Sequence, residues 1–295
     1  MYNHHKVATL NDLIENIETK IENSNYDSSY QKRLEDFLIN NIKKKYGNIT
    51  AVSTIFLIEI YNKKGSYEIS EVNQWYYRNK EFASLFEEIL RSKTKSMRYY
   101  LISIEYYNGD PILIVGEPDG LRFEGKMNNK AKIFEAKSFN LTDFIQSIKE
   151  LKDKEDYILI KRVLNKIKIN SSQLILYQYL LEKTQKFGLI GWIDKINLYG
   201  NIYLYSDNIE YLLWARETIE QNFNTIKRII RKDAKTYNAY NLSLKDVESI
   251  NINNKDVYYF EIDFRVEYNQ KIVENYFKNL NELIKSLKQV DNRNL

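Results

Sequence analysis

The sequence predicts a mixed α/β (α+β) protein in which helices flank a central sheet. Two observations carry this prediction. Apolar stripes with helical spacing alternate along the chain with short runs rich in tyrosine, isoleucine and valine, which favour strands. Between residue 79 and about residue 206, these elements follow in the order helix, three strands, helix, strand. We expect residues 1–64 to form a helical N-terminal region, and residues 65–295 to form the main domain with a C-terminal extension.

Two helices are expected near the N-terminus. The first begins after Thr9, whose side chain can form a capping box with Asp12. The second begins at the serine pair that starts with Ser28, and it ends at Gly47. The apolar segment 50–61 is too short to be assigned to a helix or to a strand.

The segment 79–138 is predicted to contain one amphipathic helix and three strands. The first two strands flank Asn108-Gly109, a strong hairpin signal, because both central residues of the turn need positive φ. The second strand ends at the turn Pro118-Asp119-Gly120, and the third covers residues 131–138.

A long stretch that favours helix follows, up to about residue 186, and its clearest part begins with Ser171 or Ser172 as the cap. Two strands are then expected around a turn at Gly200-Asn201. The last expected elements are a helix over 208–232, a strand over 257–268 and a final helix near 271–288.

The composition limits the chemistry that the chain can use. Its 295 residues include no cysteine and only two histidines, which excludes disulfides, thiolate zinc sites and cysteine-held iron–sulfur clusters. Any catalysis must therefore use carboxylates, lysines or hydroxyls. No apolar run reaches 18 residues, and the N-terminus lacks the apolar core of a signal peptide, so we expect a cytoplasmic protein with no membrane partner.

Basic and aromatic residues offer candidate contacts to nucleic acid. The basic cluster consists of Lys227, Arg228, Arg231 and Lys232. Such a cluster can follow a phosphate backbone, but it is more often a solvated helix face, and the net charge of +4 does not decide between the two. The run Trp75-Tyr76-Tyr77 could stack on bases, although aromatic residues more often belong to a core.

One stretch combines acidic and basic residues in a pattern that can hold a metal ion. Glu135 and Lys137 point to one face of the strand over 131–138, because side chains alternate along a strand. Asp119 precedes Glu135 by 16 positions, and a hairpin would bring both carboxylates to the same end of the sheet. Two carboxylates beside a lysine suit magnesium and the hydrolysis of phosphodiesters. The backbone carbonyl of Ala136 could supply a further metal oxygen.

The Glu-x-Lys pattern alone is not specific, because it recurs at Glu18 and at Glu150 in stretches that favour helix. Only Glu135 lies on a predicted strand downstream of Pro118-Asp119. The alternative interpretation is an exposed strand with a cross-strand ion pair, which is worth at most about 1 kcal/mol. The strand and turn patterns alone leave both interpretations open.

Together these residues resemble the PD-(D/E)XK nucleases, whose motif is matched by Pro118-Asp119 and, after 15 intervening residues, by Glu135-Ala136-Lys137. Gln173 and Tyr177 match the QxxxY signature of the RecB-like branch, which includes recombination exonucleases and CRISPR-associated relatives. The resemblance covers roughly residues 70–206. It implies a restriction-endonuclease-like core of order αβββαβ, with a mixed central sheet.

The resemblance also implies roles for these residues. Asp119 and Glu135 would ligate Mg²⁺ or Mn²⁺ together with the backbone carbonyl of Ala136. Lys137 would position the attacking water or stabilise the transition state. The QxxxY pair would support the site or contact the nucleic-acid strand.

This chain departs from the RecB-like pattern at two points. The branch usually carries a histidine on the first core helix, and this chain has none after His5. Glu88 or Glu87 would take that place as a metal ligand, and Glu81 and Glu105 remain open as well. The cysteines that hold an iron–sulfur cluster in CRISPR-associated relatives are missing, so no such cluster is expected.

We therefore expect a Mg²⁺- or Mn²⁺-dependent nuclease that hydrolyses phosphodiester bonds in single- or double-stranded DNA. The alternative is a non-catalytic DNA-binding or assembly protein that retains the nuclease fold. A third hypothesis places a toxin-like or viral accessory function in residues 1–64. Whether RNA is also cut, whether cutting starts at ends, and whether the chain forms a homo-oligomer stay open.

Overall fold

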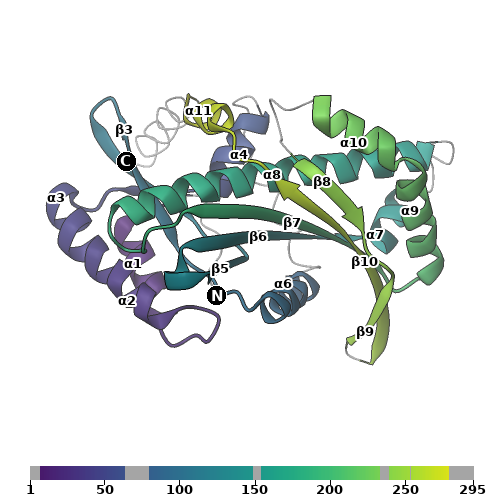
Figure 1. Cartoon of the computed structure of the whole chain (residues 1–295), viewed down its shortest axis with the longest axis horizontal. Helices are drawn as coiled ribbons and strands as arrows, with labels where there is room; N and C mark the ends of the chain where they lie inside the picture. Colours follow the sequence, from purple (N-terminus) through teal and green to yellow (C-terminus); the bar gives the residue numbers. More distant parts are fainter. Residues whose placement is uncertain (1–6, 64–79, 149–153, 233–238, 253, 279–295) are drawn as a thin grey trace, which may run out of the picture.

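The structure is a computed structural model that describes residues 7–63, 80–148, 154–232, 239–252 and 254–278. It is a mixed α/β fold with two mixed sheets that are flanked by helices (Figure 1). The predicted mixed α/β class is confirmed.

The first sheet, called the small sheet, contains four strands. In spatial order they are β1 (Val7–Thr9), β2 (Thr50–Ser53), β4 (Asp110–Gly116) and β3 (Leu101–Tyr107). Strand β2 is parallel to β4, and the other neighbours are antiparallel. Strands β3 and β4 form the predicted hairpin, and the φ angles of Asn108 and Gly109 at its turn are 47° and 91°.

The second sheet, called the large sheet, contains the remaining strands. Their spatial order is β5 (Gly120–Glu124), β6 (Lys130–Asn140), β7 (Lys195–Ser206), β10 (Lys255–Val266) and β8 (Ala239–Leu244), and β9 (Glu248–Ile252) pairs with β10. Only β6 and β7 are parallel among these described strands. Their connection contains α7 (Leu141–Ile148) and α8 (Glu155–Lys186). A short 3₁₀ turn (Lys126–Asn128) joins β5 to β6.

Helices cover both faces of the large sheet (Figure 1). Helix α8 packs against β6, β7 and β3, so it bridges the two sheets. Helix α6 (Lys80–Thr94) lies on the opposite face of the large sheet and contacts β5 and β6. Three further helices complete the described C-terminal part: α9 (Ile209–Gln221), α10 (Phe223–Lys232) and α11 (Gln270–Lys278).

The N-terminal part is largely helical, as predicted. Its helices are α1 (Leu10–Glu18), α2 (Ser28–Phe37), a π-helical turn (Leu38–Lys43), α3 (Lys44–Tyr46) and α4 (Thr54–Lys63). The capping box of Thr9 and Asp12 is present, and Gly47 ends the helix with a φ of 76°. The cap of α2 is Asp27, not a serine, because the Asp27 carboxylate accepts the backbone N–H of Tyr30.

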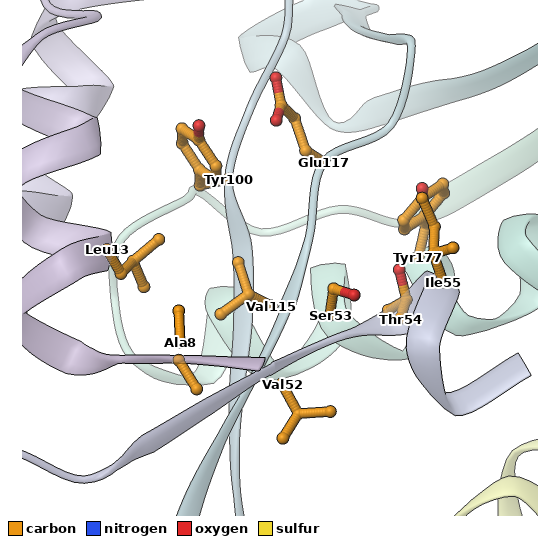
Figure 2. A pocket seen from close by; sticks show the side chains of 11 residues that line it. Ala8, Leu13, Val52, Ser53, Thr54, Ile55, Tyr100, Val115, Glu117 and Tyr177 are labelled. Carbon is orange, nitrogen blue, oxygen red and sulfur yellow. The ribbon is translucent and has the colours of Figure 1, made fainter. Parts of the chain in front are cut away.

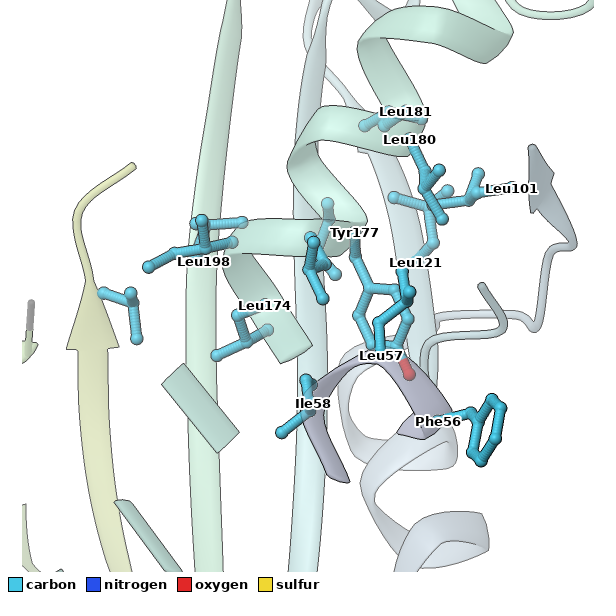
Figure 3. Close-up of a cluster of buried hydrophobic side chains, with 14 of the residues drawn as sticks. Phe56, Leu57, Ile58, Leu101, Leu121, Leu174, Tyr177, Leu180, Leu181 and Leu198 are labelled. Carbon is cyan, nitrogen blue, oxygen red and sulfur yellow. The ribbon is translucent and has the colours of Figure 1, made fainter. Parts of the chain in front are cut away.

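The N-terminal part shares its sheet and its core with the rest of the chain. The unassigned segment 50–61 forms β2, which pairs with β4, and most of α4. Leu57 and Ile58 of α4 are buried beside Tyr177 and Leu180 of α8 (Figure 3). The division at residue 64 stays a prediction, since residues 64–79 lie outside the described part.

The prediction of three strands between the first core helix and the long helix is wrong, because the structure has four. The additional strand is β5, which pairs with β6 from Gly120 opposite Phe134 to Glu124 opposite Lys130. Its five residues follow the turn at Pro118 directly and carry a mixed charge pattern. Such a short segment shows no alternation by which sequence analysis could recognise a strand.

The predicted helix cap at Ser171 or Ser172 and the predicted turn at Gly200 are also wrong. Ser171 and Ser172 do not cap a helix, because they are buried in the middle of the 32-residue helix α8. Gly200 is not at a turn, because β7 continues through it. A Cβ atom at Gly200 would lie 2.0 Å from the ring of Phe264, so this glycine permits close packing between β7 and β10.

The C-terminal elements were predicted in part. The expected helix over 208–232 is two helices, α9 and α10, which break at Asn222. The strand over 257–268 is confirmed as β10, whereas β8 and β9 were not predicted. The final helix begins at Gln270. Its expected continuation over 279–288 lies outside the described residues, as does Trp75-Tyr76-Tyr77.

Candidate functional site

Asp119 lies where the chain passes from the small sheet to the large sheet. The pairing of β5 with β6 begins at Gly120 opposite Phe134, so the next position on that edge of β6, Ala136, has no strand partner on the β5 side. The Asp119 carboxylate takes this place and accepts the backbone N–H of Ala136 at 2.7 Å. The chain therefore fixes Asp119 against the strand that carries Glu135 and Lys137.

Glu135 and Lys137 share one face of β6, as the predicted alternation requires. Phe134 and Ala136 pack toward α6 on the other face, beside Phe86. The Lys137 ammonium donates a hydrogen bond to Oε1 of Glu135, and only 2% of the Glu135 side chain is exposed. Oε2 of Glu135 is buried and has no hydrogen-bond partner among the described residues.

Burial and the charge of Asp119 act on the other ionisable groups of the cluster. Burial raises the pKa of Glu135 to about 8, and the charge of Asp119 adds to this effect. Burial lowers the pKa of Lys137, but the charges of Glu135 and Asp119 outweigh it, so the net shift is upward. The pairing with Lys137 therefore opposes the effect of burial on Glu135 without cancelling it, because the pKa of Glu135 remains raised.

The structure separates the two glutamates that compete on the first core helix. Burial and the charge of Asp119 raise the pKa of Glu87 to about 7, and Lys137, Arg98 and Arg91 oppose this shift. Glu88 is exposed. Glu105 lies on β3, and its carboxylate accepts a hydrogen bond from the Tyr179 hydroxyl at 2.6 Å. The geometry thus brings Glu87, and not Glu88, into the cluster with Asp119 and Lys137.

Two arginines that the sequence analysis missed, the buried Arg91 and the partly buried Arg98, also belong to the cluster. Arg91 donates to the backbone carbonyl of Asp119 at 3.2 Å and lies 3.7 Å from the Glu87 carboxylate. Arg98 pairs with Glu87 and, at 3.4 Å, with Glu117. Arg91 follows Glu87 by four residues on one helix, and this spacing could have indicated from the sequence that the two side chains pair. Arg98 follows the helix in an irregular segment and gave no pattern to detect.

Gln173 and Tyr177 lie one helical turn apart on α8, at the inner side of the cluster. The Gln173 amide donates to the Tyr177 hydroxyl at 3.4 Å, and both side chains are buried. Burial raises the pKa of Tyr177, and the charges of Glu135 and Asp119 raise it further. The tyrosine is therefore close enough to the acidic pair to sense its charge, although its ring packs in the core (Figure 3).

A second lysine approaches β6 from α8. Lys166 donates to the backbone carbonyl of Ser138 at 3.0 Å. Burial, together with the charges of Lys137 and Arg162, lowers the pKa of Lys166 to about 8. Asp119 and Lys166 thus cover two successive positions, Ala136 and Ser138, on the edge of β6 that β5 leaves unpaired.

The predicted basic cluster lies elsewhere in the molecule. Lys227, Arg228, Arg231 and Lys232 are on α10. This helix packs on β8, α8 and α9, at the end of the molecule away from α6 and β5 (Figure 1). Arg228, Arg231 and Lys232 are exposed, and the Lys227 ammonium lies 4.5 Å from the centre of the Phe223 ring. The structure does not bring these residues to the acidic cluster.

The donor set fits a metal ion that takes few protein ligands. In the part of the chain that the structure describes, no group of three or more histidine, aspartate or glutamate side chains is arranged to hold a metal. Magnesium, however, commonly uses one or two carboxylates and keeps several waters. Asp119 and the buried Oε2 of Glu135 can supply these two. The Ala136 carbonyl points to the same edge of β6 as its N–H, toward Asp119.

Comparisons with known proteins add no family assignment. No protein-family model matches the chain, and no curated protein or solved structure proved similar to it. None of the described helices combines the length and the apolar character needed to cross a bilayer.

Proposed function

We propose that the chain is a Mg²⁺- or Mn²⁺-dependent nuclease that hydrolyses phosphodiester bonds in DNA, on a restriction-endonuclease-like core of the RecB-like type. The observation that carries this proposal is the cluster of Glu87, Asp119, Glu135 and Lys137, in which Asp119 is fixed against β6, Lys137 pairs with the buried Glu135, and burial together with the charge of Asp119 raises the pKa values of Glu87 and Glu135. Such clusters of perturbed groups are characteristic of catalytic sites.

The fold around the cluster supports the same proposal. Helix α6 precedes the strands, β5 and β6 are antiparallel, and α8 connects β6 to the parallel strand β7. The αβββαβ core has three strands between its two helices, whereas here four strands lie between α6 and α8 and the first two belong to the small sheet, so the pattern is followed by β5, β6, α8 and β7. Asp119 lies between the two sheets, and Glu135 and Lys137 lie on β6, which is next to the edge strand β5 in the large sheet.

Each residue can be given a chemical role in phosphodiester hydrolysis. A divalent cation held by Asp119 and Glu135 would polarise the phosphate and lower the pKa of water. The protonated ammonium of Lys137 would stabilise negative charge that develops on the phosphate oxygens. Glu87, whose pKa is about 7, can accept a proton near neutral pH. Arg91 and Arg98 offset part of the negative charge of the carboxylates.

The decisive assay is cleavage of linear and circular DNA, each single- and double-stranded, in the presence of Mn²⁺. We expect the wild-type protein to cut at least one of these substrates. Lys137→Ala should lower the rate by about 100-fold or more, because it removes a charge aimed at the transition state. Lys161→Ala, an exposed lysine on α8, is the matched control and should keep the rate.

Circular dichroism of each variant separates loss of chemistry from loss of the fold. Equal cleavage by the wild-type protein and by folded Lys137→Ala would overturn the proposal, as would the absence of cleavage on all four substrates and on the corresponding RNA. Cleavage of circular DNA would identify an endonuclease, whereas cleavage of linear DNA alone would identify an exonuclease.

A non-catalytic DNA-binding or assembly protein is the second candidate, and one observation favours it. Lys137 already pairs with Glu135, and Arg98 already pairs with Glu87, so protein cations compensate much of the cluster's charge. A protein of this kind should bind DNA without Mn²⁺, and Asp119→Ala should leave the affinity unchanged. Calorimetric titration of DNA into both proteins measures this directly, and a requirement for Mn²⁺ would exclude this candidate.

A further inference from the structure

A cavity adjoins the acidic cluster at the point where β2 runs into α4 (Figure 2). Its walls are mostly apolar and include Ala8, Val52 and Val115. Its polar groups include the Glu117 carboxylate and the hydroxyls of Thr54 and Tyr177. The cavity is thus built by the N-terminal part of the chain together with the strand that leads to Asp119.

Two of the residues that line this cavity relate it to the candidate site. Tyr177 lines the cavity, and the charges of Glu135 and Asp119 act on its hydroxyl. Glu117 lines the cavity two residues before Asp119, and Arg98 pairs with both Glu117 and Glu87. A molecule in the cavity would therefore sit next to any group that binds at Asp119 and Glu135.

The size of the cavity restricts its occupant. The centres of water-sized molecules can occupy about 70 Å³ of it. Because one water needs roughly 10–15 Å³ on this measure, the space corresponds to about five to seven waters. This suits one flat ring system, and it is too small for a base pair or a protein segment.

The chemistry of the cavity restricts the occupant further. The Glu117 carboxylate offers only hydrogen-bond acceptors to an occupant, so it favours a hydrogen-bond donor there, although the start of α4 by itself would favour an anion. Tyr26 and Arg98 donate hydrogen bonds to Oε1 of Glu117, and the charge of the Lys20 ammonium also acts with that of Glu117. Oε2 can therefore accept a hydrogen bond from an N–H donor. A carboxylate commonly accepts a hydrogen bond from the exocyclic amino group of a base in this way.

We propose that this cavity binds one unpaired nucleobase that carries an exocyclic amino group, as part of the nucleotide whose phosphate lies at Asp119 and Glu135. The proposal rests on the proposed nuclease function, because that function supplies the nucleic-acid strand. It specifies the substrate as single-stranded or locally unpaired at this position. Thymine should bind less well, because two carbonyl oxygens flank its ring N–H and would face the carboxylate.

Saturation-transfer NMR with dCMP and dTMP, in the absence of metal, tests the cavity without needing cleavage. We expect the ring protons of dCMP to receive more saturation than its sugar protons, and dTMP to receive less than dCMP. Val115→Phe fills the cavity and should abolish the ring-proton signal. Val257→Phe enlarges an equally half-buried valine on β10, outside the cavity, and should keep it.

Ala8→Leu serves as a second filling variant on the edge strand β1, and thermal melting monitored by circular dichroism checks that each variant is folded. Retention of the ring-proton signal in a folded filling variant, or a signal dominated by sugar protons in the wild-type protein, would overturn the proposal. An equal signal from dTMP would overturn the amino-group preference and therefore the role of Glu117.

The cleavage assay then separates this proposal from the nuclease proposal. If the wild-type protein cuts DNA, the filling variants should cut single-stranded DNA about ten-fold or more slowly than Val257→Phe, a loss in the range that one buried base supplies. Cleavage by the filling variants at the control rate would overturn the base-binding cavity and leave the nuclease intact. Nucleotide binding in the cavity without any cleavage of DNA would support the base-binding cavity and overturn the nuclease proposal.

Discussion

At the scale of single residues, Glu135 holds the greatest interest, because its carboxylate is buried and only partly compensated. One oxygen binds Lys137, and the other has no partner among the described residues. A buried polar atom without a partner costs about 1–3 kcal/mol, and a charged one costs more. The metal-free protein therefore carries a local free-energy penalty that a cation between Asp119 and Glu135 would relieve.

This penalty predicts a pH dependence of stability in the metal-free protein. Glu135 and Glu87 have folded-state pKa values of about 8 and about 7, above the 4.5 of a free glutamate. Between pH 4.5 and about pH 8, the folded state therefore binds more protons than the unfolded state. The free energy of unfolding should fall as the pH rises through this range. The two shifts add up to about six pKa units, and one unit corresponds to about 1.4 kcal/mol, so the total loss should be at most about 8 kcal/mol.

Urea denaturation in EDTA at pH 5, 6, 7 and 8 measures this slope. Glu135→Gln should flatten it, because an amide does not titrate. Glu88→Gln, an exposed neighbour on α6, should not change it. A free energy of unfolding that stays constant or rises over this range would show that the acidic groups are not buried together as described.

At the scale of elements, the contact between β7 and β10 depends on one glycine. Gly200 lies opposite Phe264 in the register of the two antiparallel strands, and the Phe264 ring is 1% exposed. The ring occupies the space that a Cβ atom at position 200 would need. The large sheet therefore uses Gly200 to bring an aromatic core residue over the backbone of the strand parallel to β6.

We predict that Gly200→Ala destabilises the protein by about 1–3 kcal/mol, the usual cost of overpacking a core. The Cβ atom would lie 2.0 Å from a ring atom of Phe264, and that buried ring has little room to move. Gly191→Ala is the matched control, since no atom lies within 4 Å of its added Cβ. Thermal or urea unfolding of both variants tests this, and equal stabilities would contradict it.

Sequence analysis succeeded where a local pattern determines the local structure. Asn108-Gly109 specified the first hairpin, and Thr9 with Asp12 specified the start of α1, because in both cases the signal lies within four residues. It failed where packing decides. Ser171 resembles a cap but lies inside α8, and Gly200 resembles a turn but makes room for a ring from a strand more than sixty residues away.

The candidate site shows the same division. The motif identified Asp119, Glu135, Lys137 and the QxxxY pair, and the structure draws these residues together. The choice between Glu87 and Glu88 depended on how α6 is rotated against β6, which the apolar stripe did not resolve. Arg98 could not be found from sequence, because its partners Glu87 and Glu117 lie on different elements.

At the scale of the whole molecule, the N-terminal part is joined to the rest through hydrogen bonds and core packing. Strand β2 continues the small sheet beside β4, and α4 packs on α8. The candidate cavity also spans both parts, because Thr54 and Tyr177 line it together. The predicted helical region is therefore part of the scaffold that positions Asp119.

We predict that a chain lacking residues 1–64 does not fold cooperatively. The truncation removes β2 and exposes the edge of β4, and it removes α4 from the face of α8. Circular dichroism and hydrogen exchange should show a broad transition and low protection in β4 compared with the full chain. A sharp melting transition in the truncated chain would contradict this and would support a boundary near residue 64.

The unpaired edge of β6 has a consequence for solubility. Beyond Phe134, this edge is covered by two charged side chains: the Asp119 carboxylate caps the N–H of Ala136, and the Lys166 ammonium caps the carbonyl of Ser138. An open strand edge is a template on which another chain can add a strand, and charged groups are a common defence against it. Asp119 and Lys166 therefore protect the protein from aggregation, so variants designed to remove metal binding also need to be checked for self-association by light scattering.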